Sequence, residues 1–459
     1  MILYRAGWVL PVTAPPIRNG AVGVDVQGRI SYVGPASDAP RLPVHDLGEA
    51  ALLPGLVNAH THLELTAMRG FLEDMTFFDW IHTLTRARRE VLSDEDLACA
   101  ARAGIHEGLA SGVTTFADTC QSGVSLEAMR ALDVRGVMYL EVFGPDPAGR
   151  DAALAGFRAR LNSLRPGETD LVRLGVSPHA PYSVSAELFS AVGELALAER
   201  FPVAVHLAES EDETRFVRHA DGPWADSHRR RGIATSARHV SPIAFVESTG
   251  LFRARPLLIH CVTASDDDIR IMRDAGCAVA HCPVSNAKLG HGIAPVTDFL
   301  AAGICVGLGS DSVASNNRME LLEEARTAVL AQRLRSRSPH ALGAVRALEL
   351  ATIGGARALG IDDRVGSLEC GKDADLAAFP LDTLRALPSF DPAHALVWAV
   401  AGTPASLVTV RGQVLVRDGR VLSDSGESRA QVREMAERLA RWRAIQRQEV
   451  IHDHVGTGR

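Results

Sequence analysis

The sequence contains very little lysine. Lys288 and Lys372 are the only two lysines among its 48 cationic residues, and all the others are arginine. Any mechanism that needs a lysine therefore has two candidates. The 48 cationic residues are outnumbered by 55 acidic ones, which gives a formal net charge of −7. The sequence therefore has no excess of positive charge that would indicate a nucleic-acid partner or binding to an anionic membrane surface.

Long apolar runs and paired cysteines are also missing. No window of about 18 uninterrupted apolar residues suggests a membrane span, and the first residues lack the charged segment, apolar stretch and small-residue site of a secretory signal. The seven cysteines are scattered and form no C-x-x-C pair, which argues against disulfides and against a structural zinc ribbon. We therefore expect a soluble cytoplasmic protein with no membrane partner.

The middle of the chain alternates short strands with longer helices. The chain has 459 residues, 46% of them apolar, which is enough for a large core. Eight mostly apolar runs predict parallel strands that are buried on both faces: Leu56 to His60, Val113 to Asp118, Gly136 to Phe143, Val172 to Ser177, Val203 to Leu207, Leu257 to Val262, Cys277 to His281 and Ile304 to Gly309. Residues 55–364 therefore predict an α/β fold, a TIM-like (β/α)8 barrel, with a doubly wound open sheet as the alternative.

The two ends of the chain have a different pattern. Residues 1–54 and 365–425 contain short alternating runs broken by turn signals, which predict antiparallel strands. Because neither end is long enough to bury a core comfortably alone, we expect one composite domain, a small β-sandwich built from both ends. Residues 426–459 predict a charged helical tail. The long segment 210–256 predicts an extra loop over the mouth of the barrel.

Polar side chains terminate most of the predicted barrel strands. His60 and His62 lie two residues apart on a strand, so both imidazoles can face one point. Further polar residues lie at or just after the ends of later strands, namely His179, His206, His260, His281 and Asp311. The carboxyl ends of barrel strands are where this fold places chemistry. Three histidines and a carboxylate suit Zn²⁺ or Fe²⁺ with an open position for water.

The motifs LPGLVNAHTH, VSPHAPYS, HLAES, LIHC, HCPVSNAKLGHGIAPV and GLGSDS resemble the metal-dependent amidohydrolase superfamily, in its cytosine-deaminase and chlorohydrolase-like branch. The resemblance covers nearly the whole chain. It is similar in detail to deaminases of S-adenosylhomocysteine and methylthioadenosine. The segment HTHLELTAMRG adds a narrower likeness to the 6-aminodeoxyfutalosine deaminases of an alternative menaquinone pathway.

The resemblance implies roles for individual residues. It assigns one divalent metal, Zn²⁺ or alternatively Fe²⁺, to His60, His62, His206 and Asp311. Glu209 would be the general acid and base, and His260 would orient the attacking water or polarise the reacting carbon. Relatives with two metals bridge them with a carboxylated lysine at the end of the fourth strand. Here that strand ends at His179, and neither Lys288 nor Lys372 lies nearby in the sequence, so we expect one metal.

Residues on the substrate side are predicted from the same motifs. His179 resembles the substrate-contacting histidine of mononuclear deaminases, and Glu64 follows the H-x-H segment where other residues are common in the homocysteine-nucleoside enzymes. Arg150 can hold a substrate carboxylate, and it can equally be a surface arginine. Asn286 and His291 are expected at the same mouth. Phe77 and Trp80 can form an aromatic wall or pack a helix.

Taken together, the residues and the resemblance predict a hydrolase of C–N bonds in cyclic amidines, a deaminase of an adenine-type nucleoside. 6-Aminodeoxyfutalosine, in menaquinone biosynthesis, is the preferred substrate. The alternatives are S-adenosylhomocysteine or methylthioadenosine, and guanine or a triazine. A hypothesis from another class is an inactive barrel that serves as a binding protein. We expect a small purine-nucleoside-like ligand as partner, and a homodimer is left open.

Overall fold

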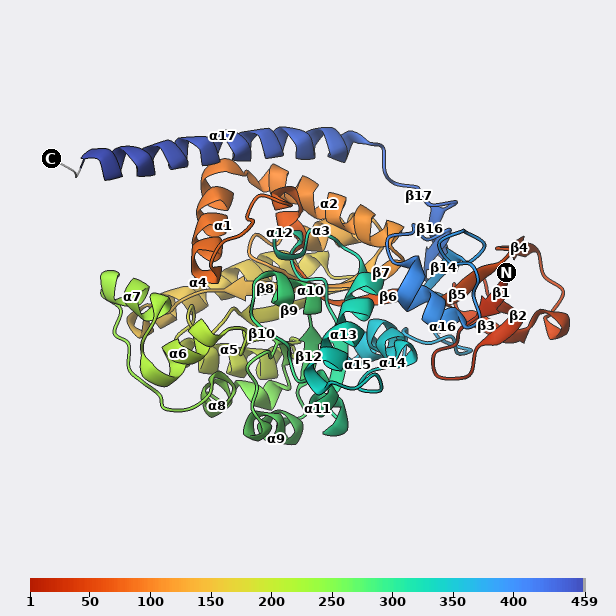
Figure 1. Ribbon diagram of the computed structural model, residues 1–459, viewed down its shortest axis with the longest axis horizontal. Coiled ribbons are helices and arrows are strands. Elements are labelled where there is room, and N and C mark those ends of the chain that lie inside the picture. The colour runs from red at the N-terminus through yellow and green to blue at the C-terminus, as the bar shows by residue number, and fades with distance from the viewer. Residues whose placement is uncertain (457–459) are drawn as a thin grey trace.

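The computed structural model describes the backbone of residues 1–456 and the side chains of residues 1–446. Two four-stranded parallel sheets lie at the centre, helices surround them, and a nine-stranded sheet lies at one end (Figure 1). The predicted α/β class, with parallel strands, is therefore confirmed.

All eight predicted runs form parallel strands, with ends that lie within two residues of those expected. The first sheet contains β6 (Leu56–Thr61), β7 (Val113–Cys120), β8 (Arg135–Val142) and β9 (Val172–Pro178), and the second contains β10 (Ala204–Leu207), β11 (Leu257–His260), β12 (Ala278–His281) and β13 (Cys305–Leu308). Every residue of β6, β7 and β8 is buried, as continuous apolar runs predict.

The two parallel sheets adjoin at both of their edges. A bridge pairs Val176 of β9 with Val203, just before β10, and another pairs Thr61 of β6 with Asp311, which follows β13. Both bridges are parallel. The carboxyl ends of strands that are distant in the sequence are thereby brought to one edge of the two sheets.

Helices lie between and after the parallel strands in the sequence. Their bounds are α1 (Phe77–Val91), α2 (Asp94–Ala110), α3 (Val124–Ala131), α4 (Arg150–Leu164), α5 (Ala186–Glu199), α6 (Glu211–His219), α7 (Pro223–Arg230), α8 (Pro242–Ser248), α9 (Asp266–Ala275), α10 (Pro283–Lys288), α11 (Val296–Ala301), α12 (Val313–Asn316), α13 (Leu321–Ser336), α14 (Ala344–Glu349), α15 (Gly355–Ala358) and α16 (Pro392–Ala395). α2 begins with a complete capping box, in which Ser93 and Asp96 each bond the other's backbone.

Short 3₁₀ and π segments complete the connections. They are η1 (Ala36–Asp38), η2 (Leu63–Met68), η3 (Pro147–Gly149), η4 (Arg165–Gly167), η5 (Leu251–Ala254), η6 (Leu350–Gly354) and η7 (Leu396–Val400).

Much of the segment 210–256, where we predicted an extra loop over the mouth of the barrel, is helical. It folds as α6, α7, α8 and η5. Pro223 and Pro242 are the reason: each stands in the first turn of a helix, where proline needs no backbone N–H partner and its fixed φ favours the helix.

The nine-stranded sheet takes strands from both ends of the chain. It contains β1 (Ile2–Val9), β2 (Ile17–Val24), β3 (Ile30–Pro35), β4 (Val44–Asp46), β5 (Ala50–Pro54), β14 (Leu376–Pro380), β15 (Leu407–Val410), β16 (Gln413–Arg417) and β17 (Arg420–Val421). The two ends meet where β5 pairs antiparallel with β14. We expected purely antiparallel strands here, but the sheet is mixed, because β1 pairs in parallel with both β4 and β5.

A buried ion cluster joins this sheet to the parallel strands. Arg135, the first residue of β8, donates to Asp375 Oδ2 at 2.8 Å and to Asp373 Oδ2 at 2.8 Å. All three side chains are almost fully buried. Because a buried charge without a partner is costly, these contacts fix how the two parts of the chain pack.

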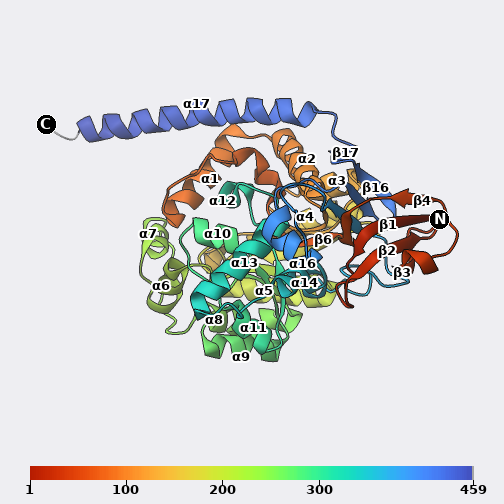
Figure 2. The same ribbon diagram turned by 45° about the vertical axis from the view of Figure 1, so that its right-hand side comes forward.

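The predicted helical tail is α17 (Glu427–Gly456), which lies along the outside of the molecule beside α1 and α2 (Figures 1 and 2). Met435 and Leu439 are buried against these helices, and Trp442 Nε1 donates to Glu90 at 2.9 Å. Residues 457–459 of the predicted tail lie outside the described residues.

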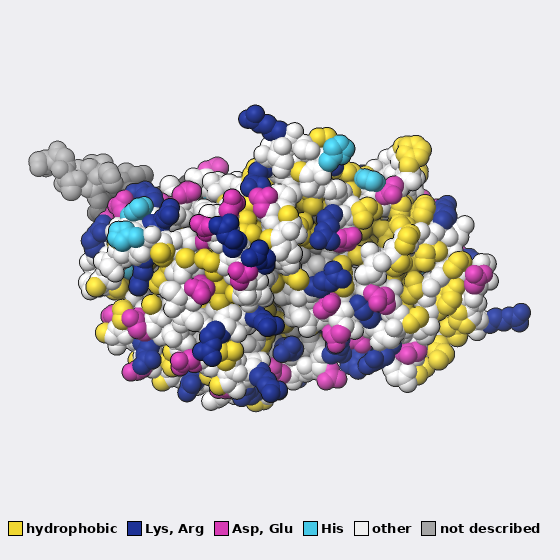
Figure 3. Space-filling view, turned by 90° about the horizontal axis from the view of Figure 1, so that it is seen from below, with side chains coloured by type: hydrophobic (Ala, Val, Ile, Leu, Met, Phe, Trp, Pro, Cys, Tyr) yellow, Lys and Arg dark blue, Asp and Glu magenta, His cyan; other side chains and the backbone are white. Residues whose placement is uncertain are grey.

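Across the described residues, no helix combines the length and apolar character that crossing a membrane requires. On the face shown in Figure 3, cationic and acidic side chains are interspersed. This distribution agrees with the low net charge of the sequence.

Candidate functional site

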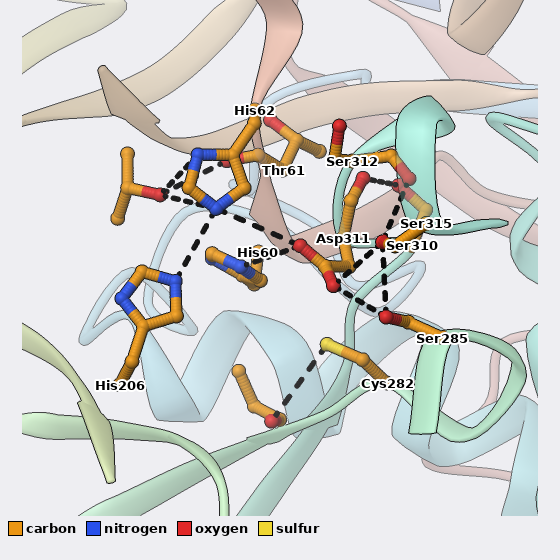
Figure 4. A network of polar contacts seen from close by, with 12 residues as sticks. His60, Thr61, His62, His206, Cys282, Ser285, Ser310, Asp311, Ser312 and Ser315 are labelled. Atoms are coloured by element: carbon orange, nitrogen blue, oxygen red, sulfur yellow. Dashed lines mark hydrogen bonds and ion pairs between the residues drawn. The ribbon is translucent and has the colours of Figure 1, made fainter. Parts of the chain in front are cut away.

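Three histidines and one aspartate converge at the carboxyl ends of the parallel strands (Figure 4). His60 and His62 come from the end of β6, and His206 lies in β10. The two facing nitrogens, His62 Nε2 and His206 Nε2, are 3.2 Å apart. Asp311 Oδ1 lies 3.2 Å from His60 Nε2 and 3.6 Å from His62 Nε2. The structure therefore brings together the four side chains that the resemblance predicted as metal ligands.

Neighbouring polar groups hold Asp311 in place. Its second oxygen, Oδ2, accepts hydrogen bonds from Ser285 at 2.6 Å and from Ser315 at 2.9 Å. Its backbone N–H donates to the carbonyl of His60 at 2.9 Å, and Asn58 accepts from the backbone of Ser310 at 2.9 Å. These contacts leave Oδ1 directed at the histidines (Figure 4).

The loop that carries His62 is held by Asp118. The carboxylate of Asp118, in β7, accepts from the backbone N–H of Leu63 at 2.6 Å and from the hydroxyl of Thr61 at 2.7 Å. Thr119 Oγ1 lies 3.1 Å from His62 Nδ1. The orientation of the His62 ring is thus set by groups of the neighbouring strand.

The donor atoms of this cluster fit a divalent transition metal. Burial lowers the pKa of His62 to about 4 and that of His206 well below its usual value, so both rings are neutral at pH 7, which is the form that binds metals. Burial alone would raise the pKa of Asp311, but contact with His60 holds it well below the usual range. Three imidazole nitrogens and a carboxylate oxygen are ligands that Zn²⁺ accepts.

Glu209 lies beside this cluster, between two further histidines. It follows β10, it is 4% exposed, and its Oε1 lies 3.5 Å from His260 Nε2 and 3.4 Å from His291 Nε2. Burial would raise the pKa of Glu209, but His260 and His291 lower it. His260 Nδ1 lies 2.9 Å from the side-chain oxygen of Asn286, which orients the ring.

A second buried glutamate fixes the backbone of Glu209. Glu213, in the first turn of α6, accepts from the backbone N–H of Ala208 at 2.8 Å and from that of Glu209 at 3.0 Å. Ala208 has a φ of +54°, a conformation that is unfavourable for alanine. The two hydrogen bonds therefore hold a strained turn that presents the Glu209 side chain to the cluster.

A cavity of about 300 Å³ opens beside the cluster and reaches Glu209. One wall is aromatic: Tyr182 and Trp224 stack with their ring centroids 4.0 Å apart, and Phe77 packs edge-on against Tyr182. Trp80 lines the same wall. Planar apolar rings of this kind favour an aromatic or heterocyclic ligand.

The other wall is polar, and it holds two of the predicted substrate residues. His179 lines the cavity, with its Nδ1 2.7 Å from Ser183 Oγ. Glu64 also lines it, but its carboxylate forms an ion pair with Arg88 at 3.0 Å and accepts from the backbone of Ser122 at 3.1 Å. Glu64 is therefore committed to partners within the protein.

Arg150 does not reach the cavity, so the prediction that it contacts the substrate is not supported. It begins α4, pairs with the adjacent Asp151 at 2.7 Å, and its side chain is 41% exposed. The reason is that the turn η3 carries the chain away from the end of β8 before Arg150. Two other arginines line the cavity, Arg88 of α1 and Arg231, which follows α7.

Neither lysine lies at the cluster. Lys288 Nζ bonds Glu73 at 2.9 Å and Asn317 at 3.0 Å. Lys372 Nζ bonds Ser367 at 2.6 Å, in the turn before β14. This placement agrees with the absence of a bridging lysine that the sequence indicated.

The sequence analysis missed Glu141, Arg88 and Trp224, all of which line the cavity. Glu141 had a usable signal, because it is an acidic residue inside the apolar run VMYLEV of β8. Burial raises its pKa to about 8. Arg88 and Trp224 lie on helices, where their spacing does not distinguish a cavity residue from a surface residue.

Curated proteins resemble this chain over nearly its whole length. Curated relatives from Moorella thermoacetica and Desulforudis audaxviator, both named 5-methylthioadenosine/S-adenosylhomocysteine deaminase, are 32% and 34% identical to this chain. The alignments cover 94% and 96% of this chain, and 98% of each relative.

Solved structures extend the comparison to the fold. An adenosine deaminase from Xanthomonas campestris with bound zinc superposes with a TM-score of 0.84 at 29% identity, over 96% of this chain and 98% of its own. A Helicobacter pylori aminofutalosine deaminase, in complex with methylthio-coformycin, shares the fold with a TM-score of 0.80 at 22% identity, over 91% of this chain and 100% of its own.

The model of the amidohydrolase family matches residues 51–415. This range contains all four convergent ligand-type residues and Glu209. The family match and the deaminase names of the relatives support a hydrolytic enzyme, as the sequence motifs predicted. The chain belongs to the amidohydrolase family.

Proposed function

We propose that this protein is a metal-dependent deaminase of adenine-type nucleosides. The observation that carries the proposal is the convergence of His60, His62, His206 and Asp311 beside Glu209, at the end of a cavity with an aromatic wall. We assign one divalent ion, Zn²⁺ or alternatively Fe²⁺, to the four convergent residues, and the roles below are proposals of the same kind.

The ion, when bound, makes water a nucleophile at neutral pH by lowering the pKa of that water to about 7. Asp311 accepts the proton that the water loses. Glu209, in its protonated form, donates a proton to the ring nitrogen next to the amino-bearing carbon. Glu209 then takes the hydroxyl proton of the addition product and passes it to the departing amine, and the proton held by Asp311 returns to Glu209, so that water and the amine are converted into a carbonyl and ammonia. His260 orients the water, and His179 contacts the ring.

The fold supports this assignment. We interpret the two parallel sheets, which adjoin through the bridges at Val176 and Thr61, as the halves of one (β/α)8 barrel over residues 55–364. Residues 1–54 and 365–425 then form the composite domain, a small sandwich, and residues 426–459 form the tail. Barrels of this type carry their chemistry at the carboxyl ends of the strands. A cytoplasmic location remains our proposal.

The substrate's distal half has two candidates. Glu64 in HTHLE favours 6-aminodeoxyfutalosine, in menaquinone biosynthesis. The names of the relatives favour methylthioadenosine or S-adenosylhomocysteine. Guanine and triazines are further from both observations, and an inactive binding protein is disfavoured because each predicted ligand residue is present at the cluster.

A substrate panel tests the proposal. Metal-loaded protein is assayed for ammonia release and for the ultraviolet shift of the ring with 6-aminodeoxyfutalosine, methylthioadenosine, S-adenosylhomocysteine, adenosine and guanine. We expect turnover of at least one adenine nucleoside and loss of turnover, with the metal retained, in Glu209→Gln. The matched control is Glu211→Gln, which alters an exposed carboxylate two residues away. Absence of turnover with every adenine nucleoside refutes the proposal.

A further inference from the structure

Glu141 places a carboxyl group without a partner at the cavity wall. It lies near the end of β8 and is 6% exposed, and its Oε1 has no hydrogen-bond partner among the described residues. Its strand neighbours Leu140 and Val142 are packed in the apolar core, so the alternation of the strand directs Glu141 to the cavity that it lines. A buried polar atom left unpaired destabilises the fold. A ligand with a matching group would offset that effect.

A second metal ion is a poor match for this group. Ligand atoms of Glu141, His179 and His206 lie within 4.8 Å of one another. However, His206 Nε2 faces His62 Nε2 at 3.2 Å, and His206 Nδ1 lies 3.2 Å from the carbonyl of His179. An imidazole nitrogen has one lone pair, so His206 cannot serve two ions. Glu141 and His179 alone are too few ligands for a transition metal.

The charges that neighbour Glu141 on this wall are paired with each other. Arg88 bonds both Glu64 at 3.0 Å and the side-chain oxygen of Gln121 at 2.9 Å. Glu64 is further occupied by the hydroxyl and the backbone N–H of Ser122. Glu141 therefore keeps a free oxygen on a wall whose neighbouring charges are neutralised.

We propose that Glu141 binds a hydroxyl group of the substrate's sugar. This inference rests on the proposed function. With the amino-bearing carbon of the ring at Glu209, the unpaired Nε2 of His179 is available for a ring nitrogen, since its Nδ1 is paired with Ser183. The carboxyl of Glu141 lies next to His179 and so meets the group adjoining the ring, which is the sugar. A hydroxyl both donates and accepts, so it pairs with a carboxyl in either protonation state.

The test compares adenosine with 2′-deoxyadenosine and 3′-deoxyadenosine in the full-length, zinc-loaded protein. We measure kcat/KM, and the dissociation constants in the Glu209→Gln background. In the wild type, loss of the bound hydroxyl should weaken both by about 10- to 100-fold. In Glu141→Ala, adenosine and the deoxynucleoside should differ by less than about threefold in kcat/KM and in dissociation constant, because the variant has already lost the protein's half of the contact. Glu141→Gln, which is nearly isosteric, should keep part of the discrimination.

Controls separate this contact from other effects. Thr85→Ala alters another side chain of the same cavity, and it should retain the wild-type ratio. The zinc content of Glu141→Ala should equal that of the wild type, and loss of zinc would overturn the proposal in favour of a ligand role. Full discrimination in Glu141→Ala overturns it as well. If the nucleosides bind with the expected ratio but release no ammonia, the proposed function fails and the sugar contact stands. If all three are deaminated equally well, the contact fails and the function stands.

Discussion

Glu213 should control the rate of the reaction without touching the substrate. Its carboxylate accepts two backbone hydrogen bonds, from Ala208 at 2.8 Å and from Glu209 at 3.0 Å. Glu213→Gln keeps one acceptor and turns an amide N–H toward the other backbone N–H. A buried N–H without an acceptor costs about 1 to 3 kcal/mol. If that cost falls on the turn that presents Glu209, the competent conformation loses about 5- to 150-fold in population.

The expected result is a fall in kcat of that size, with KM and zinc content little changed. Steady-state kinetics on the preferred nucleoside and metal analysis of the purified variant provide the measurement. Glu211→Gln, on the exposed side of the same helix α6, serves as the control and should behave as the wild type. A Glu213→Gln enzyme with wild-type kcat, or one whose defect lies entirely in zinc content, would refute the reasoning.

The remaining predictions concern the metal, the packing of the two parts of the chain, and pH. Chelation should abolish turnover, which one equivalent of Zn²⁺ per chain should restore, whereas His206→Ala should fail to retain zinc in metal analysis. Arg135→Met should lower the free energy of unfolding by about 3 to 5 kcal/mol because it leaves the buried Asp375 without its arginine partner, whereas Asp373 keeps Arg364. Arg130→Ala, which breaks an exposed pair, should change it by at most about 1 kcal/mol; equal losses in urea titrations would contradict the assignment. Glu141 has a folded-state pKa of about 8 against 4.5 for its ordinary value, so the folded state favours the protonated form and stability is lost as pH rises through 8. Glu141→Gln, which stays neutral, should therefore match the wild type near pH 4 and exceed it by up to about 5 kcal/mol at pH 9; a difference that does not grow with pH would be inconsistent with a buried, unpaired carboxyl.

The strands could be predicted because each is a continuous apolar run buried on both faces. The same logic located the candidate cluster: His60, His206 and Asp311 come from distant parts of the sequence, but parallel strands bring their carboxyl ends to one edge. The prediction thus depended on the topology of the strands, on the spacing of His60 and His62, and on the resemblance of the motifs to the amidohydrolase superfamily. Topology alone does not say which atoms face each other, and the distances among these side chains came only from the structure.

The residues of the cavity wall could not be found in this way. Trp224 lies on α7, whose first-turn proline resembles a loop signal in the sequence. Of the 48 cationic residues two are lysines, so Arg88 is one of 46 arginines. Only the fold distinguishes Arg88 from the arginines that lie on the surface. Arg150 failed as a prediction for the same reason, since the direction of the chain after β8 depends on the short turn η3.

Buried carboxylates link the separate loops of the candidate site. Asp118 of β7 holds the loop of His62, Glu213 holds the turn of Glu209, and Glu324 of α13 accepts from the backbone N–H of Val284 at 3.1 Å. In each case, a carboxylate that lies outside the cluster satisfies backbone groups that irregular loops would otherwise leave unpaired. The site's side chains come from loops that share no regular hydrogen bonding, so their relative positions depend on these contacts. Substitutions at Asp118, Glu213 or Glu324 should therefore lower turnover even though every metal ligand is still present. They do so because they displace the groups that act on the substrate.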